Sequence, residues 1–364
     1  MREGADRRTG GRADQWADPP GATMTPSPLG IALSAGPPVR LSARSLAALL
    51  LLVLSAGPPG RLAAQSLPLL HPSNPVAEAR SGLYYQPFVP PAPGWRVAIG
   101  ADYASMVELN FGVSLADTVY LLDAEVLRLN LSASHDLGRR HFLTAETYLG
   151  GSYNGFLDGF LNWYHGLFGI RIPEREDRSR NSYAFEYVFP GGRRVRFARH
   201  SAFLGDLRLG AGHRYSNQAQ SVLSLTLPTS TAGDGYARET VSVSLLNTFR
   251  ASITPRLVYE GSLNAGFTPK HGPLRAVQRD AFLLGTSGFR WRTTGGLWSF
   301  ANLYLHSPYY QNAGAGQLDR GDFTIDFGWI IRSRSGREFR FGMTEDLWPS
   351  GSAIDADFRL GFAF

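Results

Sequence analysis

Apolar and polar residues alternate with a period of two over stretches far longer than an ordinary strand. In the first stretch, Trp95, Val97, Ile99, Ala101 and Tyr103 alternate with Arg96, Ala98, Gly100, Asp102 and Ala104. The same alternation recurs over residues 203–215, 256–267 and 322–332. It places apolar side chains on one face of each strand and polar, small or charged ones on the other. Runs of about 10–14 residues exceed the usual soluble strand and fit a tilted strand that crosses a bilayer.

The number of such runs predicts the architecture. We expect strands near residues 95–109, 119–134, 140–152, 182–189, 193–199, 203–215, 220–228, 240–251, 256–268, 280–293, 297–308, 321–334, 337–347 and 355–364. Tight connections follow the even-numbered strands and mostly long polar loops follow the others, as in outer-membrane barrels with short periplasmic turns. The sequence therefore predicts an all-β fold, a transmembrane antiparallel β-barrel of 14 strands. The short connection at residues 199–202 breaks the pattern, so 12 strands is the alternative.

A soluble β-sandwich would show the same alternation, with its apolar face turned inward. Two features favour the membrane barrel. The polar faces are rich in Gly, Ser, Asn and Thr with charges of both signs, and the apolar faces often end in Trp or Tyr, as at membrane interfaces.

The chain ahead of the first strand predicts export. After Arg44, residues 45–56 form an apolar run of about a dozen residues, the size of a signal-peptide core. A buried N-terminal helix is the alternative, but Pro58, Pro59 and Gly60 would end it at once. We therefore expect residues 1–64 to hold sequence ahead of the true start and a cleaved signal peptide. Residues 65–94 would form a periplasmic N-terminal segment and residues 95–364 the barrel.

The end of the chain and its composition indicate the partners. Phe358, Leu360, Phe362 and the terminal Phe364 alternate with smaller or charged residues, and this resembles the signal read by the barrel-assembly machinery. We expect the cell outer membrane as the location, outer-membrane lipid as a partner, and the assembly machinery as a partner during biogenesis. Arg and acidic residues are interspersed, which argues against nucleic acid. With no Cys and no metal or phosphate motif, we expect no cofactor and no metal.

One segment breaks the strand pattern. Over residues 155–169, bulky apolar side chains recur at helical spacing, which predicts a short amphipathic helix in an extracellular loop. A helix this apolar could be a lid in the barrel mouth, a substrate gate, or an anchor in the outer-leaflet interface. The candidate gating residues are Phe156, Leu157, Asp158, Gly159, Phe160, Trp163, His165 and Phe168.

The stretch Gly155-Phe156-Leu157-Asp158-Gly159-Phe160, with His165, resembles the signature of a bacterial family of exported proteins of unknown function. The resemblance extends to Asn181, to residues 205–209 and to Ser73-Asn74-Pro75-Val76. Members of that family look like outer-membrane barrels. The resemblance thus implies a fold and a location, and no mechanism.

Charged residues on the polar faces should meet inside one lumen. The candidate lumen charges are Arg96, Asp102, Asp206, Arg208, Arg214, Glu260, Arg290, Asp322, Asp326, Arg340, Asp357 and Arg359. They could form structural ion pairs in a closed interior, or line a wet pore that orients passing solutes.

Three functions fit these patterns. The first is a channel or transporter for small or hydrophobic solutes, gated by the helix over residues 155–169. The second is a closed structural or adhesion barrel whose loops form the interaction surface. The third is an outer-membrane lipid-modifying enzyme, but His200 and Ser201 are adjacent and would point to opposite faces of a strand. We therefore expect no catalytic residues and no enzyme.

Overall fold

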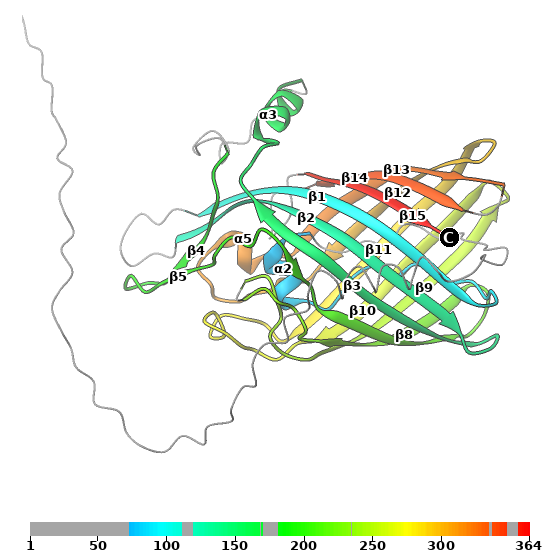
Figure 1. The fold of residues 1–364 in the computed structure, drawn as a ribbon, viewed down its shortest axis with the longest axis horizontal. Helices are drawn as coiled ribbons and strands as arrows, with labels where there is room; N and C mark the ends of the chain where they lie inside the picture. Colours follow the sequence, from blue (N-terminus) through cyan, green and yellow to red (C-terminus); the bar gives the residue numbers. More distant parts are fainter. Residues whose placement is uncertain are drawn as a thin grey trace, which may run out of the picture. The chain divides into compact units, whose positions relative to one another are not determined.

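A closed antiparallel β-barrel is the core of the structure, a computed structural model that describes residues 73–110, 119–167, 169, 181–233, 235–334, 337–347 and 356–364. The predicted leader, residues 1–64, lies outside these ranges. The ring consists of β1 (Trp95–Asn110), β2 (Val119–Asp136), β3 (His141–Tyr153), β7 (Leu207–Arg214), β8 (Ala219–Leu227), β9 (Ser242–Thr254), β10 (Leu257–Phe267), β11 (Ala281–Thr294), β12 (Leu297–His306), β13 (Asp322–Arg332), β14 (Glu338–Asp346) and β15 (Ala356–Ala363). Each strand pairs with its neighbours, and β1 pairs with β15, from Ala98 opposite Ala363 to Ser105 opposite Ala356. Hydrogen bonds therefore run around the whole ring (Figure 1).

Three short strands within the described residues lie outside this ring. β4 (Ala184–Val188) pairs with the first residues of β2, β5 (Arg194–Arg196) pairs with β4, and β6 (Phe203–Leu204) pairs with the end of β3. The prediction of 14 barrel strands is therefore wrong and the alternative of 12 is confirmed. The predicted strands at 182–189 and 193–199 fail because they are too short to cross a bilayer, which takes about 9–11 residues. They form a hairpin that extends the sheet beyond the end of the barrel.

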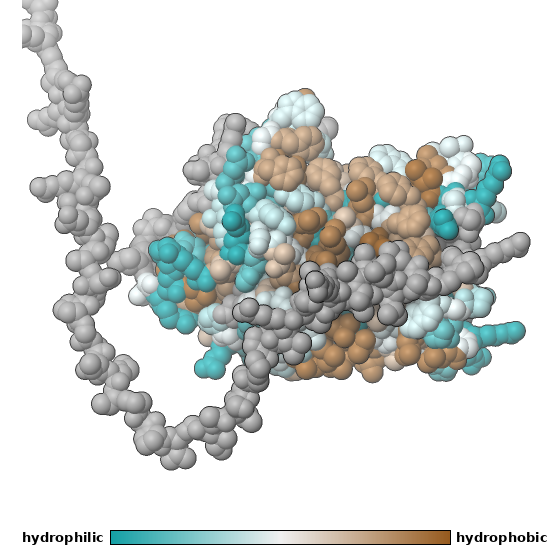
Figure 2. Space-filling model, in the orientation of Figure 1, coloured by the Kyte–Doolittle hydropathy of each residue, from teal (hydrophilic) through white to brown (hydrophobic). Residues whose placement is uncertain are grey.

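The barrel has large apolar side chains outside, and inside it has its polar side chains together with an apolar cluster that includes Val222, Leu246 and Phe282. Along β8, Gln220, Val222, Ser224 and Thr226 are buried, whereas Leu223 and Leu225 are 58% and 39% exposed. The same alternation continues around the ring, and Figure 2 shows apolar residues over the barrel wall with hydrophilic residues toward its two ends. This is the reverse of a β-sandwich, in which the apolar faces pack against each other.

Three helices are described. α2 (Pro75–Arg80) is enclosed by the strands, α3 (Asp158–Leu167) follows β3, and α5 (Gly316–Asp319) lies between β12 and β13 (Figure 1). α2 begins at Asn74, whose side-chain oxygen accepts a hydrogen bond from the Val76 amide at 2.9 Å, and Pro75 holds its first position. No helix among the described residues is long and apolar enough to span a membrane.

Glycines make room for aromatic rings inside the wall. A Cβ atom at Gly212 would lie 2.2 Å from the Phe142 ring, and one at Gly205 would lie 2.2 Å from the Tyr148 ring. Both rings are buried on β3 beside the neighbouring strand. An alanine at either glycine would therefore displace an interior ring.

Candidate functional site in the barrel lumen

Residues 73–92, which we call the plug, run through the lumen. At one end Ser73 Oγ donates to Asp357 Oδ2 at 2.6 Å, and Asn74 Nδ2 donates to Glu108 Oε1 at 2.7 Å. At the other end the Ala92 amide donates to Asp136 Oδ2 at 2.8 Å, beside the tight turn after β2. The plug therefore passes from the end of the barrel with the long loops to the end with the tight turns. It lies in the range predicted as a periplasmic segment, but its contacts are with the barrel interior.

The middle of the plug is held by side chains of the wall that bind its backbone. Thr248 Oγ1 donates to the Gln86 carbonyl at 2.6 Å, and Asn264 Nδ2 donates to the Tyr84 carbonyl at 3.0 Å. On the same side, the Phe88 amide donates to Glu260 Oε1 at 2.9 Å. Buried backbone groups need partners, and an irregular segment finds them here in polar wall side chains. Interior residues from β9 and β10 thus replace a partner strand.

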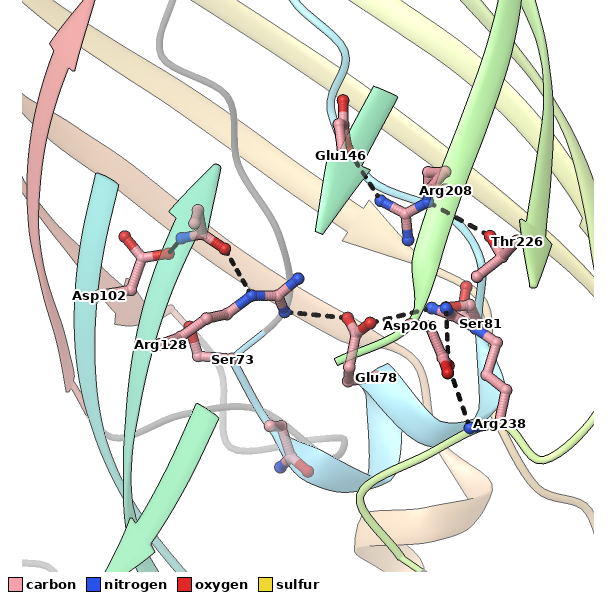
Figure 3. Close-up of polar contacts among 12 residues, drawn as sticks. Ser73, Glu78, Ser81, Asp102, Arg128, Glu146, Asp206, Arg208, Thr226 and Arg238 are labelled. Carbon is pink, nitrogen blue, oxygen red and sulfur yellow. Dashed lines mark hydrogen bonds and ion pairs between the residues drawn. The ribbon is translucent and has the colours of Figure 1, made fainter. Parts of the chain in front are cut away.

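A chain of charged groups crosses the lumen through the plug (Figure 3). It begins on the wall, where Arg359 lies 3.1 Å from Asp326 and 3.4 Å from Asp102. Asn130 links Asp102, at 2.5 Å, to Arg128, at 2.7 Å. These contacts join β13, β15, β1 and β2.

The chain continues through Glu78 of α2. One carboxylate oxygen of Glu78 lies 3.0 Å from Arg128 Nη1, and the other lies 3.2 Å from Arg238 Nη2. Arg238 also lies 3.6 Å from Asp206 and donates to the Ser81 carbonyl at 2.5 Å. Glu78 therefore connects the barrel wall at Arg128 to the loop that carries Arg238.

A fourth arginine, Arg208, lies beside this chain. Arg208 Nη1 is 3.3 Å from Glu146 Oε2, and its guanidinium stacks 4.1 Å from the centre of the Tyr84 ring in the plug. Arg128 stacks in the same way on Tyr148, at 3.9 Å. Arginine suits such positions because its planar group binds carboxylates and stacks on rings at the same time.

Both ends of the plug are fastened by arginines. Asp136 binds Arg214 at 2.5 Å and Arg96 at 2.6 Å, while Arg214 Nε donates to the Val89 carbonyl at 2.6 Å. At the other end Arg80 donates to the Thr268 and Arg279 carbonyls at 3.0 and 2.5 Å and to the Pro269 carbonyl at 3.1 Å. Burial lowers the pKa of Arg80 to about 10, so it stays charged at neutral pH. Arg80 therefore ties α2 to the loop after β10.

The plug leaves space along part of the wall. One cavity, with about 560 Å³ of empty space partly open to solvent, lies against Gly100, Gly342 and Gly361 beside Asp102 and Arg359. A second, narrower space, also partly open to solvent, adjoins Glu78, Arg128, Arg208 and Arg238. Asn130 and Ser132 line both cavities. Both cavities thus reach β2, and a third lies beside Arg80 against the loops that carry Gly235 and His271.

The predicted lumen charges meet in this interior. Arg96 and Arg340 are partly buried and the other ten are buried. Seven of them take part in the contacts above through ion pairs, namely Arg96, Asp102, Asp206, Arg208, Arg214, Asp326 and Arg359. Glu260 and Asp357 bind the plug, Arg340 binds Glu338 at 2.9 Å, and Arg290 stacks 5.0 Å from Trp298. Asp322 is buried at the start of β13.

The candidate gating residues lie elsewhere. Leu157 donates its amide to Glu125 at 2.6 Å, the Phe156 ring is 5.0 Å from Tyr103, and the Phe160 ring is 5.9 Å from Phe358. Tyr103 and Phe358 have the parity of the outward-facing residues on β1 and β15. Within α3, Asp158 and His165 are buried, and His165 lies 3.5 Å from Glu345. Trp163 is 59% exposed, Gly159 is exposed, and Phe168 is outside the described residues. These contacts place α3 against the outer wall of the barrel. The gating role of α3 stays a prediction, and a position outside the lumen does not favour it.

Several residues of the lumen site were missed by the sequence analysis. Arg128 and Glu146 have the inward parity of their strands, so extending the count of inward charges to β2 and β3 could have found them. Glu78, Arg80 and Arg238 lie in segments without periodicity. The only local signal is Asn74-Pro75, a capping residue followed by proline, which marks the start of α2.

The Glu78 carboxylate makes the plug sensitive to acid. Burial alone would raise its pKa, but Arg128 and Arg238 outweigh burial and hold the pKa of Glu78 below its ordinary value. A lowered pKa contributes stability above the unfolded-state pKa, about 4.3, and that stability is lost as pH falls through the folded-state pKa.

We therefore predict that acidification from pH 6 to pH 3 loosens the plug. Hydrogen exchange of residues 76–83, compared between the two pH values after correction for intrinsic rates, measures it. In Glu78→Gln this exchange should already be faster at pH 6, because removing one member of a buried pair costs about 3–5 kcal/mol. It should also change less with pH. An equal acid response in Glu78→Gln would assign the effect to other groups.

Within the described part of the chain, no group of three or more His, Asp and Glu side chains could hold a metal ion. The fold and the lumen define an antiparallel barrel whose interior carries many charged and polar groups and is occupied by a segment of its own chain. The protein belongs to the family described as "Protein of unknown function (DUF3187)", whose family model matches residues 74–364. The match includes both the plug and the ring.

No curated protein matches the sequence significantly. Among solved structures, the chain is similar to the COG4313 outer-membrane channel from Pseudomonas putida F1, with 14% identity and a TM-score of 0.49 over 75% of this chain and 95% of that one. It is also similar to the P. putida toluene transporter TodX, with 10% identity and a TM-score of 0.41 over 75% and 90% of the two chains. The Ralstonia pickettii toluene transporter TbuX gives 9% identity and a TM-score of 0.39 over 81% and 98%.

Proposed function

We propose that this protein is an outer-membrane channel for small hydrophilic solutes, closed in its resting state by the plug. The outer wall supports a membrane location, because large apolar side chains such as Leu223, Leu263 and Leu305 are 58–64% exposed on it. In water, an exterior of this kind would be a large exposed apolar patch that promotes aggregation. Together with the predicted signal peptide, it points to the outer membrane.

The observation that carries the channel proposal is the polar character of the plug's attachment. The lumen wall binds the plug through the polar groups of Thr248, Asn264, Glu260 and the arginines. Apolar plug residues such as Leu83 and Val89 also pack into a buried cluster with wall side chains. A hydrogen bond that water can replace contributes only about 0.5–1.5 kcal/mol net. Water entering the lumen could therefore take over these contacts when the plug moves. A wall of charges and amides also favours hydrophilic over hydrophobic solutes.

Conductance in planar lipid bilayers tests this proposal. The chain from residue 65 onward should conduct weakly, and a variant lacking residues 73–92 should conduct at least about tenfold more, because the plug no longer fills the lumen. Migration of unheated and heated samples in a denaturing gel shows whether each barrel is folded. A folded deletion variant that conducts no better than the full chain would contradict the proposal and leave the closed structural barrel.

A further inference from the structure

Three arginines, Arg128, Arg208 and Arg238, surround Glu78 at the centre of the lumen. Among the described residues of the plug, Glu78 is the only carboxylate. Its side chain is 8% exposed, and those of Arg128 and Arg238 are 5% and 1% exposed. Arg208 acts on the same carboxylate electrostatically. The arginines belong to the wall and to one loop, whereas Glu78 belongs to the segment that must move in the proposed function.

The charges balance only while the plug is in place. Arg128, Arg208 and Arg238 carry three positive charges, and Glu78, Glu146 and Asp206 carry three negative ones. Withdrawal of Glu78 leaves three positive charges against two negative ones. An uncompensated charge in a poorly solvated interior is costly, so the vacated position favours one monovalent anion. Glu146 and Asp206 would oppose a second negative charge.

The surroundings suit a carboxylate rather than a bare ion. The two oxygens of Glu78 are bound separately, by Arg128 at 3.0 Å and by Arg238 at 3.2 Å, which is a geometry set for a planar two-oxygen group. The adjoining space, lined by the same arginines together with Asn130, Ser132 and Tyr148, is too narrow for more than about one water molecule. A small carboxylate would therefore fill the volume that the Glu78 side chain leaves.

We infer that Arg128, Arg208 and Arg238 form a binding site for the carboxylate group of a small monoanionic solute, and that Glu78 occupies this site as an internal ligand. A passing solute would take the place of Glu78 when the plug moves. That role in passage rests on the proposed function, whereas the binding of a carboxylate by the arginines does not.

Rescue of a Glu78→Ala variant by acetate tests the site. The purified variant is melted in detergent micelles with 100 mM sodium acetate, and separately with sodium chloride of equal ionic strength and with neutral acetamide. Acetate should raise the melting temperature of Glu78→Ala by about 2–4 °C over both controls, the size expected for a ligand near tenfold its Kd. The wild-type protein, whose site is filled, should shift by less than about 1 °C.

Glu108→Ala is the matched control. Glu108 also binds the plug, but it does so by accepting from the Asn74 amide rather than by bridging Arg128 and Arg238. Acetate should not stabilise this variant over chloride. A Glu78→Ala barrel that is folded and shows no acetate-specific shift would overturn the inference, as would an equal shift in Glu108→Ala.

The outcomes separate the site from the channel. If acetate stabilises Glu78→Ala but the plug deletion does not conduct, the binding site is supported and the channel proposal is contradicted. Should Glu78→Ala not refold in chloride, the refolding yield becomes the measurement. A yield at least twofold higher in acetate than in acetamide supports the site, and equal yields overturn it.

Discussion

Replacing Leu223 by Arg is expected to cost the folded barrel about 2–4 kcal/mol in a bilayer, the cost of an arginine near the bilayer midplane on the lipid face of a barrel. Leu223 lies midway along β8, is 58% exposed, and is paired with the equally outward Leu245 of β9. It has no polar neighbour directly across the pair. An Arg there would have to extend through hydrocarbon to reach a polar group.

Denaturant unfolding of the protein refolded into phosphatidylcholine vesicles measures this cost. Gln218→Arg is the control, because Gln218 is exposed in the tight turn between β7 and β8 and a charge there should change stability by less than about 0.5 kcal/mol. If Leu223→Arg were as stable as the control, the outer wall would face water, and the membrane assignment would be contradicted.

The strands that could be predicted are those that face lipid on one side and the polar lumen on the other. The expected strand at 256–268 is Leu257–Phe267, and the one at 297–308 is Leu297–His306. A shift of one residue would exchange every inward and outward side chain, so the alternation in the sequence had to be strict. The short connections between the barrel strands could also be predicted, because they interrupt the alternation.

The error in strand number comes from segments where that constraint is absent. β4 and β5 pair only with each other and with the first residues of β2, beyond the ring. Tyr187 and Phe185 on β4 are buried against neighbouring loops, so an alternating pattern arises there without a bilayer. Alternation alone cannot distinguish a membrane-spanning strand from a short strand that packs on loops, whereas the length of the strand can.

The candidate site was predicted on the wall and missed in the plug. Inward charges such as Asp102, Asp326 and Arg359 follow from strand parity, because the ring brings distant strands together. The residues that join them across the lumen, Glu78 and Arg238, lie in irregular segments, whose path is decided by tertiary contacts rather than by local periodicity. No pattern in residues 73–92 predicts that they enter the barrel.

A disulfide between the plug and the wall is expected to hold the channel closed. A Cβ atom at Gly82 would lie 3.8 Å from the Cβ of Ser242 on β9, which is the usual separation in a disulfide. The natural chain contains no Cys, so Gly82→Cys with Ser242→Cys adds a single pair. The single variant Ser242→Cys is the control, because it cannot form the bond within one chain.

Single-channel recording of this double variant before and after reduction is the most direct test that the plug is the gate. We predict that the oxidised protein opens at least about tenfold less often than Ser242→Cys under the same voltage, and that a reductant restores the openings. Openings that are equally frequent with the bond intact would show that solutes pass without movement of the plug, and would contradict its role as the gate.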